Sequence, residues 1–136
     1  MRKFQTILLI FIATYIFGQN ITKAVPKLVT SRKIENSIYQ LYPTKNFYTF
    51  LKLDTRNGKM WQVHFTVANE GLRGELILNS TPLVSKEFEV IGRFTLYPTE
   101  NTYNSLLLGQ IDGLVYQVQW SNDAENRGIM SISRSE

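Results

Sequence analysis

The stretch Leu41-Tyr42-Pro43-Thr44-Lys45-Asn46-Phe47-Tyr48 returns, at an offset of 55, as Leu96-Tyr97-Pro98-Thr99-Glu100-Asn101-Thr102-Tyr103. The same offset continues without a gap, so that Gly58 matches Gly113. Over residues 39–66, 11 of 28 positions are identical at this offset. A self-match of this length indicates a tandem duplication, which constrains the architecture more than any local motif does.

The duplication covers nearly all of the chain that follows its N-terminal region. Leu28-Val29-Thr30 matches Leu83-Val84-Ser85 at the offset of 55, and the ends of the two copies match at an offset of 54. We therefore expect a single β domain over residues 28–136, with repeat 1 at 28–82 and repeat 2 at 83–133. About 110 residues are enough for a domain to bury a core of its own.

Each repeat has the composition of four short strands. Segments rich in aromatic, β-branched and leucine residues predict strands in repeat 1, at residues 38–42, 47–53, 60–67 and 74–78. Matching segments follow in repeat 2. The expected fold is all-β, with two tandem four-stranded antiparallel meanders that cover each other's apolar face. An eight-stranded barrel and a two-sheet sandwich both fit this pattern.

The hairpin around Asn57-Gly58 decides which side chains face the core. A two-residue Asn57-Gly58 turn would place Leu53 opposite Gln62 and mix the faces. A three-residue loop, with Gly58 in the left-handed conformation, pairs Leu53 with Trp61, and we choose it because register follows the buried face. The core is then predicted to contain Leu51, Leu53, Trp61, Val63 and Phe65 in repeat 1, and Leu106, Leu108, Tyr116, Val118 and Trp120 in repeat 2.

The opposite face of the predicted sheets mixes aromatic rings with amide groups. Such a face suits a polar ligand with apolar patches, a sugar chain or a partner protein. Cross-strand pairing of the same side chains also stabilises exposed sheets, so a purely structural face is the alternative. The candidate ligand-binding residues are Tyr48, Phe50, Gln62, His64, Tyr103, Gln117 and Gln119.

Candidate catalytic groups are few. His64 is the only histidine, and Asp54 and Asp112 occupy different repeat positions, where both suit acceptors for backbone N–H groups in turns. No triad spacing, phosphate loop or metal motif occurs, and the absence of cysteine removes the usual ligands of zinc and iron–sulfur clusters. We therefore expect no enzymatic activity, no cofactor and no metal site.

The N-terminus has the features of an export signal. Arg2 and Lys3 precede an almost wholly apolar run at residues 7–17, and the small residue Gly18 follows. This run is about half of the ~20 residues that a membrane-spanning helix needs. We expect a signal peptide at residues 1–18, a lead-in segment at 19–27 and export to the periplasm or the extracellular space.

Two resemblances bear on the repeat. Residues 42–63 carry Tyr-Pro-Thr-x-Asn-x-Tyr followed by Leu-x-Leu-Asp-Thr-x-x-Gly-x-x-Trp-Gln-Val, and this resembles a pattern found in pairs in uncharacterised bacterial exported proteins. That resemblance implies no activity, and repeat 2 departs from it at Gly109-Gln110 and Tyr116. Residues 53–61 also resemble the hairpin turn in blades of quinoprotein-type propellers, although a propeller typically needs at least four blades.

These features predict an exported, non-catalytic interaction module for protein or envelope assembly. The alternatives are a carbohydrate-binding module and a small hydrolase, or an inhibitor of one, that uses His64. The expected partner is a protein or a glycan, and a homodimer is open. Removal of the signal leaves 13 basic and 11 acidic residues, so nucleic acid is not expected as a partner.

Overall fold

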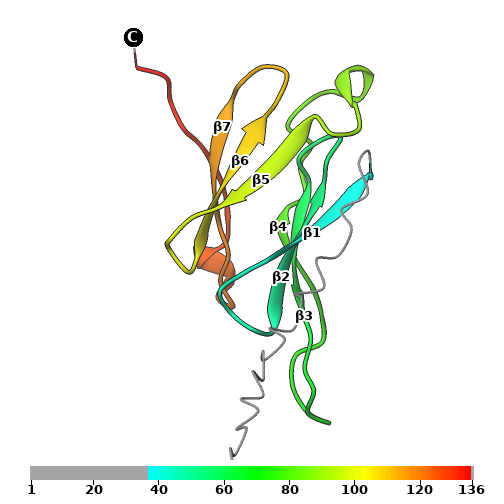
Figure 1. Cartoon of the computed structure of the whole chain (residues 1–136), viewed down its shortest axis with the longest axis vertical. Helices are drawn as coiled ribbons and strands as arrows, with labels where there is room; N and C mark the ends of the chain where they lie inside the picture. Colours follow the sequence, from blue (N-terminus) through cyan, green and yellow to red (C-terminus); the bar gives the residue numbers. More distant parts are fainter. Residues whose placement is uncertain (1–36, 136) are drawn as a thin grey trace, which may run out of the picture. The chain divides into compact units, whose positions relative to one another are not determined.

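The computed structural model describes residues 37–135, and the predicted signal peptide and lead-in segment lie outside this range. Eight strands form two separate four-stranded antiparallel meanders, so the all-β prediction is confirmed and the barrel alternative is wrong (Figure 1). Sheet A contains β1 (Tyr39–Pro43), β2 (Thr49–Asp54), β3 (Met60–His64) and β4 (Gly74–Asn79). Sheet B contains β5 (Phe94–Pro98), β6 (Asn104–Gly109), β7 (Val115–Gln119) and β8 (Gly128–Ser131). Two short 3₁₀ helices, η1 (Lys86–Phe88) and η2 (Ala124–Asn126), are the described helices.

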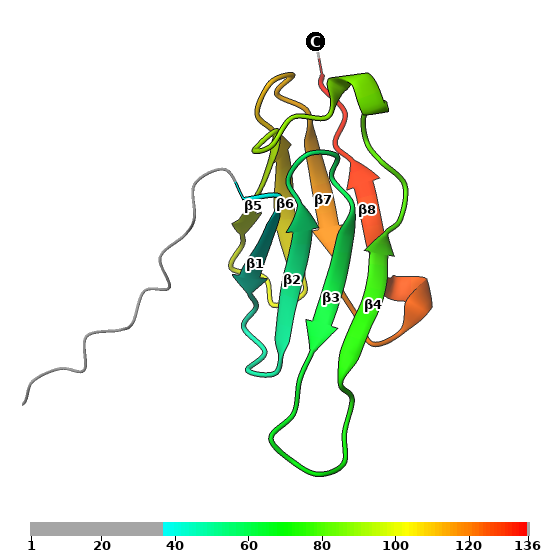
Figure 2. The same cartoon turned by 90° about the vertical axis from the view of Figure 1, so that its right-hand side faces the viewer.

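The duplication is visible strand by strand. The starts of β5, β6 and β7 follow those of β1, β2 and β3 at the same offset of 55, and the start of β8 follows that of β4 at the offset of 54. The strands also pair in the same register, because Thr49 faces His64 in sheet A as Asn104 faces Gln119 in sheet B. Figure 2 shows the two sheets as layers with their strands in the same order.

The repeated Tyr-Pro-Thr-x-Asn-x-Tyr signature forms the turn between the first two strands of each sheet. The side-chain oxygen of Asn46 accepts a hydrogen bond from the Tyr48 amide at 2.9 Å, and Asn101 accepts one from Tyr103 at 2.8 Å. Asparagine commonly hydrogen-bonds nearby backbone groups in turns, and it does so in both copies.

The β2–β3 hairpin differs from the predicted register by one residue. Leu53 pairs with Met60 rather than with Trp61. The Asp54 amide closes the hairpin by donating to the Lys59 carbonyl at 2.9 Å. The loop therefore holds four residues instead of three, and the extra residue turns every β3 side chain to the other side of the sheet.

The shape of this loop follows from its residue types. The Asp54 carboxylate accepts a hydrogen bond from the Arg56 amide at 3.0 Å, and the Gly58 amide donates to the Asp54 carbonyl at 3.0 Å. Gly58 has a φ of 78° and the matching Gly113 has a φ of 67°, which confirms the predicted left-handed conformation. Residues with a Cβ adopt that conformation at a cost, so glycine suits both loops.

The two sheets bury opposite faces of the same repeat. In sheet A, Leu51 and Leu53 are buried, whereas Lys52 lies on the outer face. In sheet B the pattern is reversed, because Leu107 matches Lys52 and is 0% exposed, while Leu106 matches Leu51 and is 38% exposed. Sheets related by a two-fold axis would bury the same face twice. These sheets instead stack face to back, with each repeat presenting a different side to the shared core.

This arrangement corrects half of the predicted core. The core between the sheets consists of Leu51, Leu53, Met60, Leu78, Phe94, Leu96, Leu107, Val118 and Trp120. Predicted core residues that face it are Leu51, Leu53, Tyr116, Val118 and Trp120. Those that lie on outer faces are Trp61, Val63, Phe65, Leu106 and Leu108. The predicted core was wrong in β3 because the register differs by one residue. It was wrong in β6 because sheet B buries the opposite side of this strand.

Candidate functional site

The candidate ligand-binding residues do not share one surface. Gln62 and His64 were expected on an outer face, but they are buried between the sheets because of the register of β3. Gln117 and Gln119 lie on the outer face of sheet B, and Phe50 lies on the outer face of sheet A. A single surface built from both repeats is therefore not formed.

Gln62 makes a polar contact between the two sheets. Its Nε2 donates to the Ser121 carbonyl at 2.8 Å and to His64 Nε2 at 2.8 Å. Its Oε1 accepts from the Ser121 amide at 3.2 Å. Ser121 is the second residue after β7, so one amide of repeat 1 binds both backbone groups of a residue in repeat 2. The Gln62 side chain is 0% exposed, and both N–H groups and the oxygen of its amide have a hydrogen-bond partner. Buried polar groups are generally paired in this way.

His64 belongs to the same buried network. Because its Nε2 accepts from Gln62, the ring proton lies on Nδ1, which faces Thr49 Oγ1 at 3.3 Å. Burial, followed by the charge of Arg127, lowers the pKa of His64 below its ordinary value of 6.5. Both ring nitrogens are bonded to side chains of sheet A, so His64 takes part in the contact between the sheets only through Gln62.

Acid should destabilise the domain through His64, and His64→Gln should remove much of that effect. The folded state favours the neutral ring, so its contribution is complete above pH 6.5 and is lost as the pH falls toward the lowered pKa. Thermal unfolding of both proteins at about pH 7.5 and about pH 5 measures this difference. The wild-type Tm should fall further than that of the variant, which carries the glutamine found at the matching position, Gln119. Equal falls in the two proteins would contradict a buried neutral histidine.

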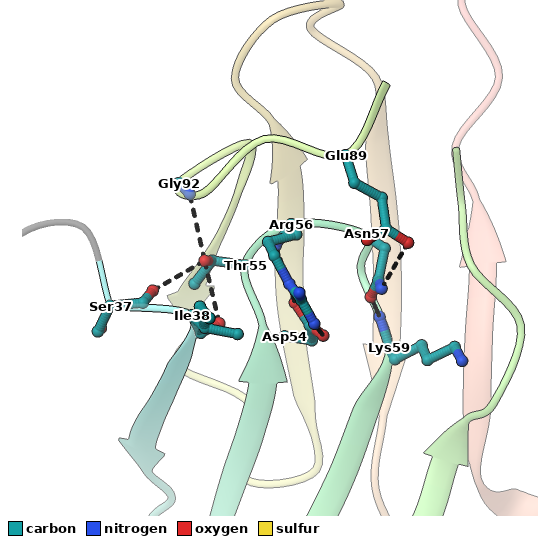
Figure 3. A network of polar contacts seen from close by, with 9 residues as sticks. All are labelled: Ser37, Ile38, Asp54, Thr55, Arg56, Asn57, Lys59, Glu89 and Gly92. Carbon is teal, nitrogen blue, oxygen red and sulfur yellow. Dashed lines mark hydrogen bonds and ion pairs between the residues drawn. The ribbon is translucent and has the colours of Figure 1, made fainter. Parts of the chain in front are cut away.

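A second buried network lies at the β2–β3 turn (Figure 3). The hydroxyl of Thr55, which is 0% exposed, donates to the Ser37 carbonyl at 2.9 Å and accepts from the Gly92 amide at 3.2 Å. Its own carbonyl accepts from the Phe94 amide at 2.8 Å. Thr55 therefore connects the segment before β1 to the segment before β5, which is a structural role.

The acidic side chains of the two turns are also occupied by local partners. Arg56 forms a two-point ion pair with Asp54, at 3.0 Å from Nε and 2.8 Å from Nη2. Asp112 accepts from the Leu114 amide at 3.0 Å. Both aspartates act as turn acceptors, as the sequence predicted, and they form no acid pair with each other.

Two matching hollows lie beside the Tyr-Pro-Thr turns. The hollow of repeat 1, about 240 Å³ in volume, is lined by Asn46, Tyr48, Thr49, His64, Phe65, Thr66, Gly71, Leu72 and Asn122. The hollow of repeat 2, about 260 Å³, is lined by Asn101, Tyr103, Asn104, Gln119, Trp120 and Ser121. Six lining positions match between the two repeats. Each hollow has an aromatic pair, with ring centroids 5.7 Å apart for Tyr48 and Phe65 and 5.2 Å apart for Tyr103 and Trp120. The sequence identified four of these lining residues but not the hollows.

The outer face of sheet A is largely apolar. Tyr39, Leu41 and Ile77 are 53%, 60% and 58% exposed. Lys52 lies over the Trp61 ring at 4.6 Å, and its ammonium also pairs with Glu75. Lys52 is therefore neutralised by a neighbouring carboxylate, and its stem lies along apolar surface.

The outer face of sheet B is also apolar at its centre. Leu106 and Met130 are 38% and 50% exposed, and Leu108 and Val115 lie partly exposed beside them. Gln117 lies among these side chains and donates to Asn104 Oδ1 at 3.0 Å. The domain thus has an apolar face on each side.

Residues 37–135 contain no group of three or more His, Cys, Asp or Glu side chains placed to hold a metal ion. In the same range, no helix has the length and hydropathy needed to cross a membrane. Comparisons with protein-family models, with curated proteins and with solved structures find no match to this chain.

Proposed function

We propose that this chain is an exported, non-catalytic interaction module that binds protein through the outer faces of its two sheets. The observation that supports this most is the exposure of large apolar side chains on both faces, with Leu41 60% and Leu106 38% exposed. Burying apolar surface against a partner contributes about 25 cal/mol per Å². Contiguous apolar patches of this kind are typical of interaction sites.

We propose no enzymatic role because the side chains that could act as catalytic groups, His64 and Asp54, are bonded to neighbouring residues of the domain. His64 and Asp54 have their polar atoms committed to hydrogen bonds within sheet A and its β2–β3 turn. His64 does line the hollow of repeat 1, but the other side chains that line this hollow include no carboxylate and no lysine. Export follows from the basic and apolar pattern of residues 1–18.

Capture of envelope proteins by immobilised chain tests the proposal. We expect the wild-type protein to retain a defined partner, and Leu41→Asp or Leu106→Asp to lose it, because an aspartate on either face would be buried unpaired. Val67→Asp is the matched control, since Val67 is 83% exposed in the β3–β4 loop. Identical retention by all four proteins would contradict binding through the sheet faces.

Carbohydrate binding at the two hollows is the second candidate. Paired small hollows with a tyrosine and an asparagine, Tyr48 with Asn46 and Tyr103 with Asn101, offer a ring to stack on and amides to hydrogen-bond hydroxyls. Tyr48→Ala and Tyr103→Ala should each weaken retention in polysaccharide gels about tenfold, with an unchanged Tm. Unchanged migration of both variants, or their unfolding, would remove this candidate.

A further inference from the structure

The exposed face of sheet B carries side chains that repeat 1 buries. At three repeat positions the two copies carry the same residue, which is buried in sheet A and lies on the outer face in sheet B. These pairs are Leu51 with Leu106, Leu53 with Leu108, and Gln62 with Gln117. Folding of one chain does not require leucines at the exposed positions. The outer face of sheet B therefore has the side chains needed to pack against another sheet, as the inner face of sheet A does.

The outer face of sheet A is related to the core in the converse manner. Its side chains stand at the positions that repeat 2 uses for packing, as the pairs Leu41 with Leu96, Trp61 with Tyr116, Val63 with Val118, and Phe65 with Trp120 show. The domain therefore exposes both halves of the contact that its own two repeats make with each other.

We infer that further copies of this chain stack on it head to tail, with the outer face of sheet B of one copy covering the outer face of sheet A of the next. Each new contact repeats the face-to-back contact between repeat 1 and repeat 2. This inference rests on the proposed function and names its partner. Such a contact joins two different surfaces, so it closes into a ring or continues as a filament.

Gln117 has a defined role in this stack. In repeat 1 the amide of Gln62 binds both backbone groups of Ser121, and the residue that matches Ser121 is Thr66. Gln117 of one copy would bind the backbone of Thr66 in the next copy. The contact uses backbone groups, so it does not depend on the side-chain difference between serine and threonine.

Charge at the rim of the stack agrees with the same geometry. Lys45 and Glu100 occupy one repeat position with opposite signs, and they form an ion pair at 3.0 Å between the two repeats. In a continued stack, Glu100 of one copy would meet Lys45 of the next, so the alternation of sign continues. An exposed pair of this kind adds little affinity but favours the correct partner over like-charged alternatives.

Complementary variants of the full exported chain test the inference by sedimentation velocity across a concentration series. Wild type should sediment as assemblies of two or more copies, and Val67→Asp should behave like wild type. Leu41→Asp and Leu106→Asp should each be monomeric, because each loses one of the two different surfaces. An equimolar mixture of the two variants should form a 1:1 dimer and nothing larger, through the intact face of each. The restored dimer also shows that both variants are folded.

The outcomes separate this inference from the proposed function. A wild-type monomer at high concentration, or a dimer broken by only one of the two variants, would overturn head-to-tail stacking. If such a monomer still captures an envelope protein through the same faces, the proposed function stands without the self-contact. If it captures nothing, both fail. Gln117→Ala should weaken the assembly about tenfold in a titration, and an unchanged midpoint would remove its assigned role.

Discussion

Leu107→Lys should leave the domain largely unfolded at room temperature. Leu107 is 0% exposed and belongs to the cluster of apolar side chains between the sheets, so a lysine there would place its charge among apolar groups. Burying an unpaired charge costs several kcal/mol, which is comparable to the ~5–15 kcal/mol that stabilises an ordinary domain. Circular dichroism with urea titration would show the loss of the folded baseline.

The reverse substitution, Lys52→Leu, is the matched control at the same repeat position. Lys52 lies on the outer face, where its ion pair with Glu75 and its contact with the Trp61 ring are partly exposed. Each is worth at most about 1 kcal/mol, so the variant should stay within about 2 kcal/mol of wild type. A similar loss of stability in both variants would contradict the assignment of these positions to opposite environments.

Gln62→Ala should lower the free energy of unfolding by about 3 kcal/mol. The substitution leaves both backbone groups of Ser121 and one ring nitrogen of His64 without their partner, and each unpaired buried group costs about 1–3 kcal/mol. Urea unfolding monitored by tryptophan fluorescence measures the loss, since Trp120 lies in the core next to Ser121.

Gln117→Ala provides the comparison from the second copy. Its amide binds Asn104 on the outer face, where water can replace it, so a dilute sample should lose no more than about 1 kcal/mol. If the two alanine variants lost equal stability, the different roles assigned to these identical residues would be wrong.

The strands and turns were predictable because the duplication repeats the turn-forming residues that separate the strands. The asparagine of each Tyr-Pro-Thr turn bonds the tyrosine amide two residues on, and Gly58 and Gly113 adopt the expected left-handed conformation. These interactions are local, so the residue types alone indicate them. Matching residues in both copies then placed all eight strands.

The facing of the side chains was not predictable from the same pattern. The alternation of apolar and polar residues along a strand identifies the buried face only when the other face is polar. Here, segments such as residues 47–53 are largely apolar on both sides. The duplication also suggested that both copies bury the same side. Face-to-back stacking makes the two copies bury opposite sides, and the fourth residue in the Thr55–Gly58 loop reversed β3 as well.

The candidate site was predicted in composition rather than in arrangement. Gln62 and Gln117, which occupy the same repeat position, were both expected among the ligand-binding residues, whereas Gln62 binds repeat 1 to repeat 2. The prediction placed it on a ligand-binding surface, because nothing local shows that Ser121, 59 residues away, supplies its partner. The hollows at Tyr48 and Tyr103 could not be predicted, because their shape depends on how the turns pack against the ends of the strands.

Thiol accessibility at matched positions tests the face-to-back arrangement most directly. The chain has no cysteine, so a single cysteine can be placed in turn at positions 51, 52, 106 and 107 in the Leu41→Asp background, which blocks stacking. We predict slow alkylation at 51 and 107 and fast alkylation at 52 and 106 under native conditions. Protection of 51 together with 106, and labelling of 52 together with 107, would show that both repeats bury the same face and would contradict the account.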